Sequence, residues 1–157
     1  MTDSVPKRQH AVKDETGAEL TEVLVETVRL AELFTSTGEA LAKREGQTLA
    51  RWLVLETLES GPKPVAEVAR RLRLTRQSVQ RVADLLERDG LIVYEDNPRH
   101  RRAKLARLTP KGAKVLGRIQ RAQREWADRH AAELRPADLE YARELLRGIR
   151  EALTQVR

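Results

Sequence analysis

The stretch from Pro64 to Gly112 constrains the fold more than any other part of the chain. A short helical pattern, PVAEVARRL, is followed by a turn at 73–75 and by a second helical pattern, TRQSVQRVADLLERDG. Thr75 is a good N-cap, because its side-chain oxygen can accept from an orphan amide of the first turn. Gly90 tolerates the left-handed conformation that ends many helices. Two short helices joined by a tight turn predict a helix-turn-helix.

The second of these helices has two distinct faces. Apolar residues at helical spacing predict one buried stripe, formed by Val79, Val82, Leu85 and Leu86. At about 100° per residue, the opposite face carries polar and charged side chains, namely Gln77, Gln80, Arg81, Asp84 and Arg88. Gln and Arg directed outward are typical of a recognition helix, which enters the DNA major groove.

Two β-prone runs follow, LIVY at 91–94 and LARL at 105–108. The polar segment between them, EDNPRHRRAK, predicts a hairpin with a long basic tip. The cations of this tip are Arg99, Arg101, Arg102 and Lys104. Attached to a helix-turn-helix, such a hairpin is a wing. Its tip can reach the minor groove or flanking phosphates while the helix occupies the major groove.

The positive charge is concentrated in the same region. The whole chain carries a net charge of +6. Between Pro62 and Gly112, 13 Lys or Arg residues stand against 6 Asp or Glu, a net of +7, whereas the remaining residues hold 17 against 18, a net of −1. A charge run alone is more often a solvated face. Localised on a helix-turn-helix, however, it is the electrostatic footprint expected of nucleic-acid binding.

Several chemistries find no support in the sequence. With 0 cysteines, disulfides, thiol redox sensing and thiolate metal sites are excluded. The histidines His10, His100 and His130 are scattered, without a partnered nucleophile or metal-ligand spacing, and there is no glycine-rich phosphate loop. We therefore expect no catalytic residues, no metal and no cofactor. No apolar run approaches the roughly 18 residues of a membrane span, so we expect a soluble, cytoplasmic protein without a membrane partner.

The rest of the chain predicts helices. The expected fold class is mainly α with a small β-hairpin wing: a winged helix-turn-helix plus a helical dimerisation region. Residues 1–17 are polar and aperiodic, which predicts a disordered arm, and residues 18–157 are expected to form a single domain. Helices are predicted over 18–43, 48–59, 110–132 and from Pro136 toward the C-terminus.

The helices outside the DNA-reading lobe carry wide apolar stripes. The first is apolar on two faces and so must pack against two surfaces, and the last has an apolar repeat near heptad spacing. We assign 18–45 and 110–157 to a homodimer interface and 48–109 to the DNA-binding lobe. A two-fold dimer presents two recognition helices to successive major grooves, about 34 Å apart. An intramolecular bundle of the same helices is the alternative.

From Ala18 to the C-terminus, this order of helices, helix-turn-helix and wing resembles the MarR family, the multiple-antibiotic-resistance type of bacterial transcription regulator. The passages that carry the resemblance are VAEVARRLRLTRQSVQRVADLLERDGLI and RRAKLARLTPKG. The second is similar to the family's wing-to-helix signature, with a glycine at Gly112. The chain departs from the pattern at His100, where the family usually has an aspartate that braces the wing; Asp96 is a candidate substitute.

The resemblance implies a homodimer that binds a pseudo-palindromic operator, usually as a repressor. It also implies a small aromatic or phenolic effector that binds between the dimerisation and DNA-binding parts and releases the DNA. By this resemblance the ligand site lies among the first, second and fifth helices, where Phe34 and Trp52 are the candidates. Trp52 lies in the apolar run 52–55, which favours an ordinary core tryptophan over a ligand-binding one.

Base readout requires side chains that reach two groove atoms at once. Arg76 and Arg81 suit guanine, whereas Gln77 and Gln80 suit adenine. Ser78, near the helix N-terminus, suits a phosphate. Arg102 is expected in the minor groove, with the other wing cations on phosphates. The complete predicted DNA-binding set is Thr75, Arg76, Gln77, Ser78, Gln80, Arg81, Arg99, Arg101, Arg102 and Lys104.

Two other classes of protein compete with this interpretation. An architectural, sequence-tolerant DNA-binding protein of the nucleoid type needs the same charge, but it does not need polar readers on the exposed helix face. A protein-interaction module that uses the winged fold without DNA conflicts with the localised net charge of +7. We therefore expect a sequence-specific, dimeric transcription regulator that binds double-stranded DNA.

Overall fold

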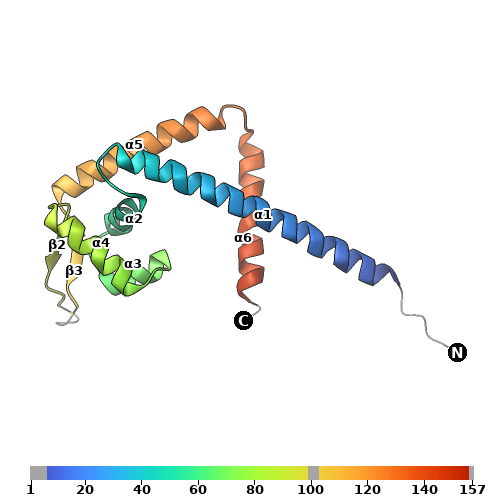
Figure 1. The fold of residues 1–157 in the computed structure, drawn as a ribbon, viewed down its shortest axis with the longest axis horizontal. Coiled ribbons are helices and arrows are strands. Elements are labelled where there is room, and N and C mark those ends of the chain that lie inside the picture. Colours follow the sequence, from blue (N-terminus) through green and yellow to red (C-terminus); the bar gives the residue numbers. More distant parts are fainter. Residues whose placement is uncertain (1–6, 99–102, 156–157) are drawn as a thin grey trace.

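The computed structural model describes residues 7–98 and 103–155. Within these residues the chain forms six helices and a small antiparallel sheet (Figure 1). The elements in chain order are α1 (Lys7–Lys43), α2 (Leu49–Glu59), β1 (Lys63–Pro64), α3 (Val65–Leu72), α4 (Arg76–Arg88), β2 (Ile92–Glu95), β3 (Leu105–Leu108), α5 (Pro110–Ala131) and α6 (Pro136–Thr154). The expected fold class, mainly helical with a β-hairpin wing, is confirmed.

Helix α1 begins at Lys7, not near Ala18 as the sequence pattern predicted. The interpretation of 1–17 as a disordered arm is therefore wrong from Lys7 onward, and residues 1–6 lie outside the described residues. The segment from Lys7 is rich in Lys, Arg, Gln, Ala and Glu, which have good helix propensity. Extending an existing helix is much less costly than starting one. An apolar stripe is therefore not required for the helix to continue toward the N-terminus.

The hydrophobic core lies in a lobe made of α2, α3, α4, the sheet and the first half of α5. Aromatic residues make up only 3% of the chain, and the largest fully buried side chains are all aliphatic: Leu55, Leu58, Leu86, Ile92, Leu116, Ile119, Val54, Val68 and Val79. Trp52, only 4% exposed, adds an aromatic ring to this core. The end of α1 joins the core through Leu41 and Ala42. The lobe is thus the packed centre from which the other helices extend.

The helix-turn-helix forms as predicted, with α3 and α4 joined by a tight turn. Arg73 adopts the left-handed conformation (φ 55°) that ends α3, and Thr75 caps α4. The buried face of α4 is made of Val79, Ala83 and Leu86. Leu85, predicted in the buried stripe, is exposed instead. It lies about 100° around the helix from its neighbour Leu86, which is fully buried at the centre of the stripe.

The sheet has three strands in the order β1-β3-β2, all antiparallel. Strands β2 and β3 form the predicted wing, with Tyr94 opposite Ala106 in the register. Strand β1, which the sequence analysis did not predict, pairs Lys63 with Ala106 and Pro64 with Leu105. It hydrogen-bonds the segment that enters α3 to strand β3 of the wing.

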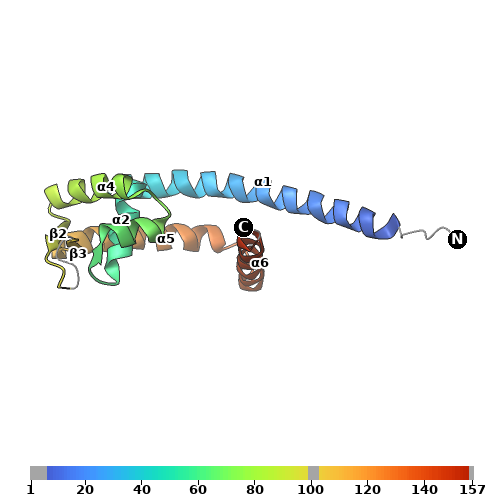
Figure 2. The ribbon, with the colours of Figure 1, turned by 90° about the horizontal axis from the view of Figure 1, so that it is seen from below.

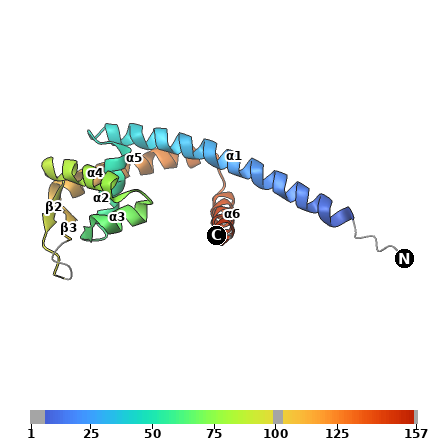
Figure 3. The same cartoon turned by 60° about the horizontal axis from the view of Figure 1, so that its bottom comes forward.

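Two long helices leave the lobe. The N-terminal part of α1 extends well beyond it, and α6 turns away from the end of α5 (Figures 1 and 2). Figure 3 shows α3, α4 and the hairpin gathered at one end of the molecule, apart from α6. None of the described residues of α6 is buried. The intramolecular bundle considered above is therefore not formed. The large apolar side chains left exposed on α1 and α6 are Leu24, Val25, Val28, Leu30, Leu33, Phe34, Leu139, Tyr141, Leu145, Leu146 and Leu153.

Candidate nucleic-acid interface and the adjoining cleft

Helix α4 presents a polar face along a shallow groove. The residues that line this groove are Arg76, Gln77, Gln80, Arg81 and Asp84. Gln80 is half-buried, and the other members are exposed. The structure therefore brings the predicted base-reading side chains together on one face of one helix. Ser78, the predicted phosphate ligand, is also exposed, in the first turn of the helix.

Both ends of α4 are held in place. At the N-terminal end, the amide of Ser78 donates to Thr75 Oγ1 at 3.2 Å, as the N-cap prediction required. At the C-terminal end, the guanidinium of Arg51 from α2 pairs with the carboxylate of Asp89. This hydrogen bond and the charge of Arg51 lower the pKa of Asp89. Lys111 Nζ donates to the carbonyl oxygen of Asp89 at 2.7 Å. The polar face therefore projects from a helix that is hydrogen-bonded to neighbouring residues at both ends.

Three side chains join α4 to the wing. Gln80 Nε2 donates to Asp84 Oδ1 at 2.7 Å and to Tyr94 Oη at 2.8 Å. The hydroxyl of Tyr94 donates to Asp84 Oδ1 at 3.1 Å. Helical spacing places Asp84 on the polar face of α4 beside Arg81 and Arg88, but its hydrogen-bond partners in the structure are Gln80 and Tyr94. The reason is that the wing folds against α4, a contact that helical spacing alone does not reveal.

Tyr94 remains a neutral phenol in this environment. Burial of its ring, followed by the negative charge of Asp84, raises the pKa of Tyr94 to about 12. Its hydroxyl therefore keeps its hydrogen, and it donates to Asp84 while accepting from Gln80. Tyr94 is the residue that connects recognition helix and wing, and the sequence analysis treated it only as part of a β-prone run.

The wing is described in part. Lys104 is exposed just before β3, and the guanidinium of Arg107 pairs with Glu95 at 2.7 Å across β2 and β3. This ion pair braces the base of the hairpin, whereas bracing by Asp96 in place of the family's aspartate stays a prediction. Outside the described residues lie the other wing-tip predictions, Arg99, His100, Arg101 and Arg102.

A cleft of about 470 Å³ opens between α1, α2 and α5. It is lined by Phe34, Thr35, Thr37, Gly38, Leu41, Leu49, Trp52, Leu53, Glu56, Gln123 and Trp126. Phe34 and Trp52, the two predicted ligand-binding residues, thus meet in one cleft among the expected helices. Trp52 also belongs to the hydrophobic core. It is therefore both a core residue, as its apolar neighbours predicted, and part of the cleft lining. Trp126 of α5 packs edge-on against Phe34, with ring centroids 6.3 Å apart.

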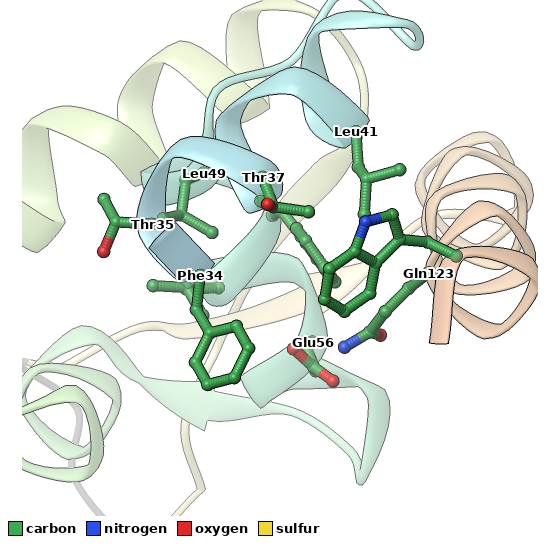
Figure 4. A pocket seen from close by; sticks show the side chains of 11 residues that line it. Phe34, Thr35, Thr37, Leu41, Leu49, Glu56 and Gln123 are labelled. Atoms are coloured by element: carbon green, nitrogen blue, oxygen red, sulfur yellow. The ribbon is translucent and has the colours of Figure 1, made fainter. Parts of the chain in front are cut away.

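The polar groups of the cleft are few. In Figure 4 the carboxylate of Glu56 and the amide of Gln123 point to the same part of the cleft, beside the ring of Phe34. Burial, followed by the charge of Glu59, raises the pKa of Glu56. The indole Nε1 of Trp52 is buried without a hydrogen-bond partner. The described lining of the cleft is therefore mainly apolar and aromatic, and Glu56 is its one acidic residue.

Sequence reasoning missed Glu56, Gln123 and Trp126 as cleft residues. Trp126 lies at helical spacing from Val115 and Ile119 on one face of α5, and this spacing was the available signal. Glu56 and Gln123 lie on helices whose mutual contact depends on the tertiary fold, so nothing in the sequence links them. In the part of the chain that the structure describes, no group of three or more His, Cys, Asp or Glu residues is arranged to hold a metal ion. None of the described helices is long and apolar enough to cross a membrane.

Comparison with known proteins identifies relatives of this fold. The model of the MarR family matches residues 45–103, which hold α2, the helix-turn-helix and the first strand of the hairpin. The protein Rv2011c of Mycobacterium tuberculosis, which is uncharacterized, is 38% identical over 135 residues, covering 86% of this chain and 94% of its own.

Two solved structures resemble the whole architecture. Sco3205, a MarR family transcriptional regulator from Streptomyces coelicolor in complex with DNA, has a TM-score of 0.74 and 25% identity, and the match covers 87% of this chain and 88% of that chain. Staphylococcus aureus MarR, in complex with salicylate and kanamycin, has a TM-score of 0.76 at 16% identity, over 90% of this chain and 96% of that chain. At 16% identity, the similarity to Staphylococcus aureus MarR shows a shared fold and nothing more. With residues 45–103 matched by the family model and its fold shared with solved members, the chain belongs to the MarR family of DNA-binding transcription regulators.

Proposed function

We propose that the chain is a sequence-specific, homodimeric repressor that binds a pseudo-palindromic operator and releases it when a small ligand binds. Sequence-specific binding is supported by the polar face of α4. Arg76, Gln77 and Arg81 are exposed there, on a helix whose two ends are hydrogen-bonded to neighbouring residues. Arg and Gln are the side chains that read guanine and adenine edges in the major groove. The complex of Sco3205 with DNA supports this assignment by analogy.

The dimer proposal is supported by the apolar faces of α1 and α6, which nothing covers within the described chain. Exposed apolar surface of this extent is typical of an interaction site. A two-fold dimer would place two copies of α4 about one helical turn of DNA apart, roughly 34 Å. The repressor role follows the family resemblance.

The proposal is tested by incubating the protein with sheared genomic DNA of its source organism and sequencing the bound fragments. We expect discrete peaks that share a pseudo-palindrome, with half-sites about 10 base pairs apart. Transcription of the genes beside these peaks should rise when the regulator gene is deleted. Uniform coverage of the genome would instead favour an architectural protein, and transcripts that fall on deletion would indicate an activator.

The ligand proposal is supported by the cleft between α1, α2 and α5. Its volume of about 470 Å³ lies within the range of roughly 300–1,000 Å³ typical of small-molecule sites. The cleft joins a helix of the proposed dimer interface to the core of the DNA-binding lobe. A ligand that wedges these helices apart changes the distance between the two α4 helices of a dimer and therefore their fit to the operator.

The chemistry of the cleft favours a flat aromatic ligand that is neutral or cationic. Phe34, Trp52 and Trp126 offer aromatic surfaces, and none of the described residues that line the cleft is Lys, Arg or His. Glu56 would repel a carboxylate, whereas a donor or cation on the ligand would pair with it.

Three matched compounds test this ligand chemistry, namely benzamidine, benzamide and benzoate. We expect benzamidine to quench tryptophan fluorescence and raise the melting temperature most, and benzoate least. The variant Glu56→Gln should lose the preference for benzamidine over benzamide. Equal binding of benzoate and benzamidine by the wild type, or an unchanged preference in the variant, would contradict the proposed role of Glu56.

A further inference from the structure

The half-buried amide of Gln80 is held by a closed triangle of hydrogen bonds at the junction of α4 and the wing. Its Nε2 donates to Asp84 Oδ1 at 2.7 Å and to Tyr94 Oη at 2.8 Å, and the Tyr94 hydroxyl donates to the same Oδ1 at 3.1 Å. Gln80 and Asp84 are one turn apart on α4, whereas Tyr94 comes from β2. The triangle lies between two surfaces, because Gln80 lines both the groove along α4 and a hollow under the wing.

The chemistry of the three groups settles which way the amide faces. An aspartate carboxylate accepts hydrogen bonds and does not donate them. The group of Gln80 that lies 2.7 Å from Asp84 must therefore be the NH₂ and not the carbonyl. The hydrogen of the Tyr94 hydroxyl is used on Asp84, so the hydroxyl oxygen is left to accept from Gln80. Both amide hydrogens of Gln80 are then engaged within the protein, and Oε1 remains as its acceptor.

An amide in this state cannot read adenine in the usual way. The bidentate pairing of Gln with adenine needs one N–H for N7 and one carbonyl for the N6 amino group. With both hydrogens engaged, Gln80 can accept from an amino group but cannot donate to N7. Adenine N6 and cytosine N4 offer such an amino group in the major groove, whereas guanine and thymine present acceptors at the corresponding positions.

We propose that Gln80 is an acceptor-only reader, which selects an amino-bearing base, adenine or cytosine, at one position of the operator. Asp84 and Tyr94 are the positioning residues that impose this state. The proposal rests on the sequence-specific DNA binding proposed above and replaces the sequence-based expectation that Gln80 pairs bidentately with adenine. The base that Gln80 selects thus depends on Tyr94, a residue of the wing that does not itself have to contact the DNA.

The wing is built to keep Tyr94 in place. Tyr94 pairs with Ala106 in the β2–β3 ladder, and Ala106 is 1% exposed. The ion pair between Glu95 and Arg107 ties the neighbouring positions of the same two strands. Because burial and the charge of Asp84 raise the pKa of Tyr94 to about 12, its hydroxyl stays available as a donor across the working pH range.

The test is selection from a pool of random DNA duplexes, followed by sequencing of the bound fraction. The wild type is compared with Gln80→Ala, Tyr94→Phe, Asp84→Ala and the control Gln77→Ala. The base position at which Gln80→Ala loses its preference, while Gln77→Ala keeps it, identifies the contact of Gln80. At that position the wild type should accept adenine and cytosine within about twofold of each other, and guanine and thymine about tenfold less.

The positioning role has its own readout. Tyr94→Phe frees one amide hydrogen for N7, so adenine should become about tenfold preferred over cytosine at the same position, within the discrimination expected of a bidentate pair. Asp84→Ala frees the other hydrogen and should shift the preference in the same direction. Circular dichroism checks that each variant is folded, and either variant can test the positioning role if the other does not fold. Wild-type selection of guanine, of thymine or of adenine alone would overturn the proposal, as would an unchanged preference in every folded variant.

The outcomes separate this inference from the proposed function. If the wild type enriches a motif but Gln80→Ala flattens no position, sequence-specific binding stands and the acceptor-only readout is wrong. If the wild type enriches no motif at all, the proposed function fails and the inference fails with it.

Discussion

A Cβ atom on Gly112 would lie 2.0 Å from the carbonyl oxygen of Leu91. The first turn of α5 and the segment that enters β2 therefore touch at a point that only glycine allows. The same carbonyl accepts from the amide of Thr109 at 3.1 Å. Gly112 is the glycine of the wing-to-helix signature, and its role is to let the wing close against α5.

Gly112→Ala should destabilise the protein by about 2 kcal/mol or more, because the backbone must move to admit the methyl group. The matched control is Gly117→Ala in the same helix, where an added Cβ meets nothing within 4 Å. The control should be stabilised by up to about 1 kcal/mol, since alanine is the better helix former. Urea unfolding measures both, and equal free energies of unfolding for the two variants would show that the contact is relieved at little cost.

Thr75→Ala should lower the free energy of unfolding by about 1 kcal/mol, because the Ser78 amide loses its capping acceptor. Thr75→Ser keeps the acceptor and should remain close to the wild type. The measurement is urea unfolding without DNA, which separates the cap from any contact of Thr75 with phosphate. If the serine variant is destabilised as much as the alanine variant, the methyl group matters and not the cap.

The helix-turn-helix was predictable because its signals are local. Thr75, Gly90 and the spacing of the apolar residues of α4 all act within a few residues of one another. Strand β1 was not predictable, because two residues carry no pattern and its partner Ala106 lies far along the chain. The start of α1 was placed too late because periodicity was taken as a requirement for helix formation.

The residues of the candidate site could be predicted from the sequence, but the hydrogen bonds between them could not. The polar face of α4 follows from helical geometry, and the structure brings its members together. The hydrogen bonds of Gln80 depend on a strand that pairs elsewhere, so spacing along the helix could not reveal them. The cleft was expected from the family resemblance, but Glu56 and Gln123 meet only through the packing of α2 and α5.

Arg81→Ala and Lys104→Ala should affect DNA binding differently. Loss of Arg81 should cost about 1–3 kcal/mol on the preferred site and relax specificity at one position. Loss of Lys104 should weaken binding to all sequences alike and reduce the slope of log affinity against log salt by about one, as for a phosphate contact. Anisotropy titrations at several salt concentrations measure both, and identical behaviour of the two variants would remove the distinction between base and phosphate contacts.

The pKa of Tyr94 should fall below its value of about 12 in Asp84→Asn, because the charge that disfavours the phenolate is gone. The fall should be partial, since burial is the larger cause. The raised pKa disfavours the phenolate in the fold, so its contribution to stability is present below the ordinary pKa of about 10 and is lost as the pH rises toward 12. Tyrosinate absorbance, taken as the difference from Tyr94→Phe, measures the shift, and an unchanged pKa would place Asp84 outside the triangle in solution.

Leu145→Glu should dissociate the proposed dimer. Leu145 is 46% exposed on α6, and a charge there would have to be buried against a second copy of the chain. The control is Gln155→Glu near the end of the same helix. Sedimentation should give a dimer for the wild type and the control, and a monomer for Leu145→Glu. A monomeric wild type would leave the apolar faces of α1 and α6 to another partner.

Sequence-specific recognition of DNA can be measured by competition in fluorescence anisotropy. A labelled duplex that carries a site from the genomic selection is bound at roughly 0.15 M salt and challenged with unlabelled site or with a scrambled duplex of the same composition. We expect the unlabelled site to compete about 10³-fold better or more, within the range of specific binders. Equal competition by the scrambled duplex, with affinity that simply falls as salt rises, would contradict sequence-specific recognition.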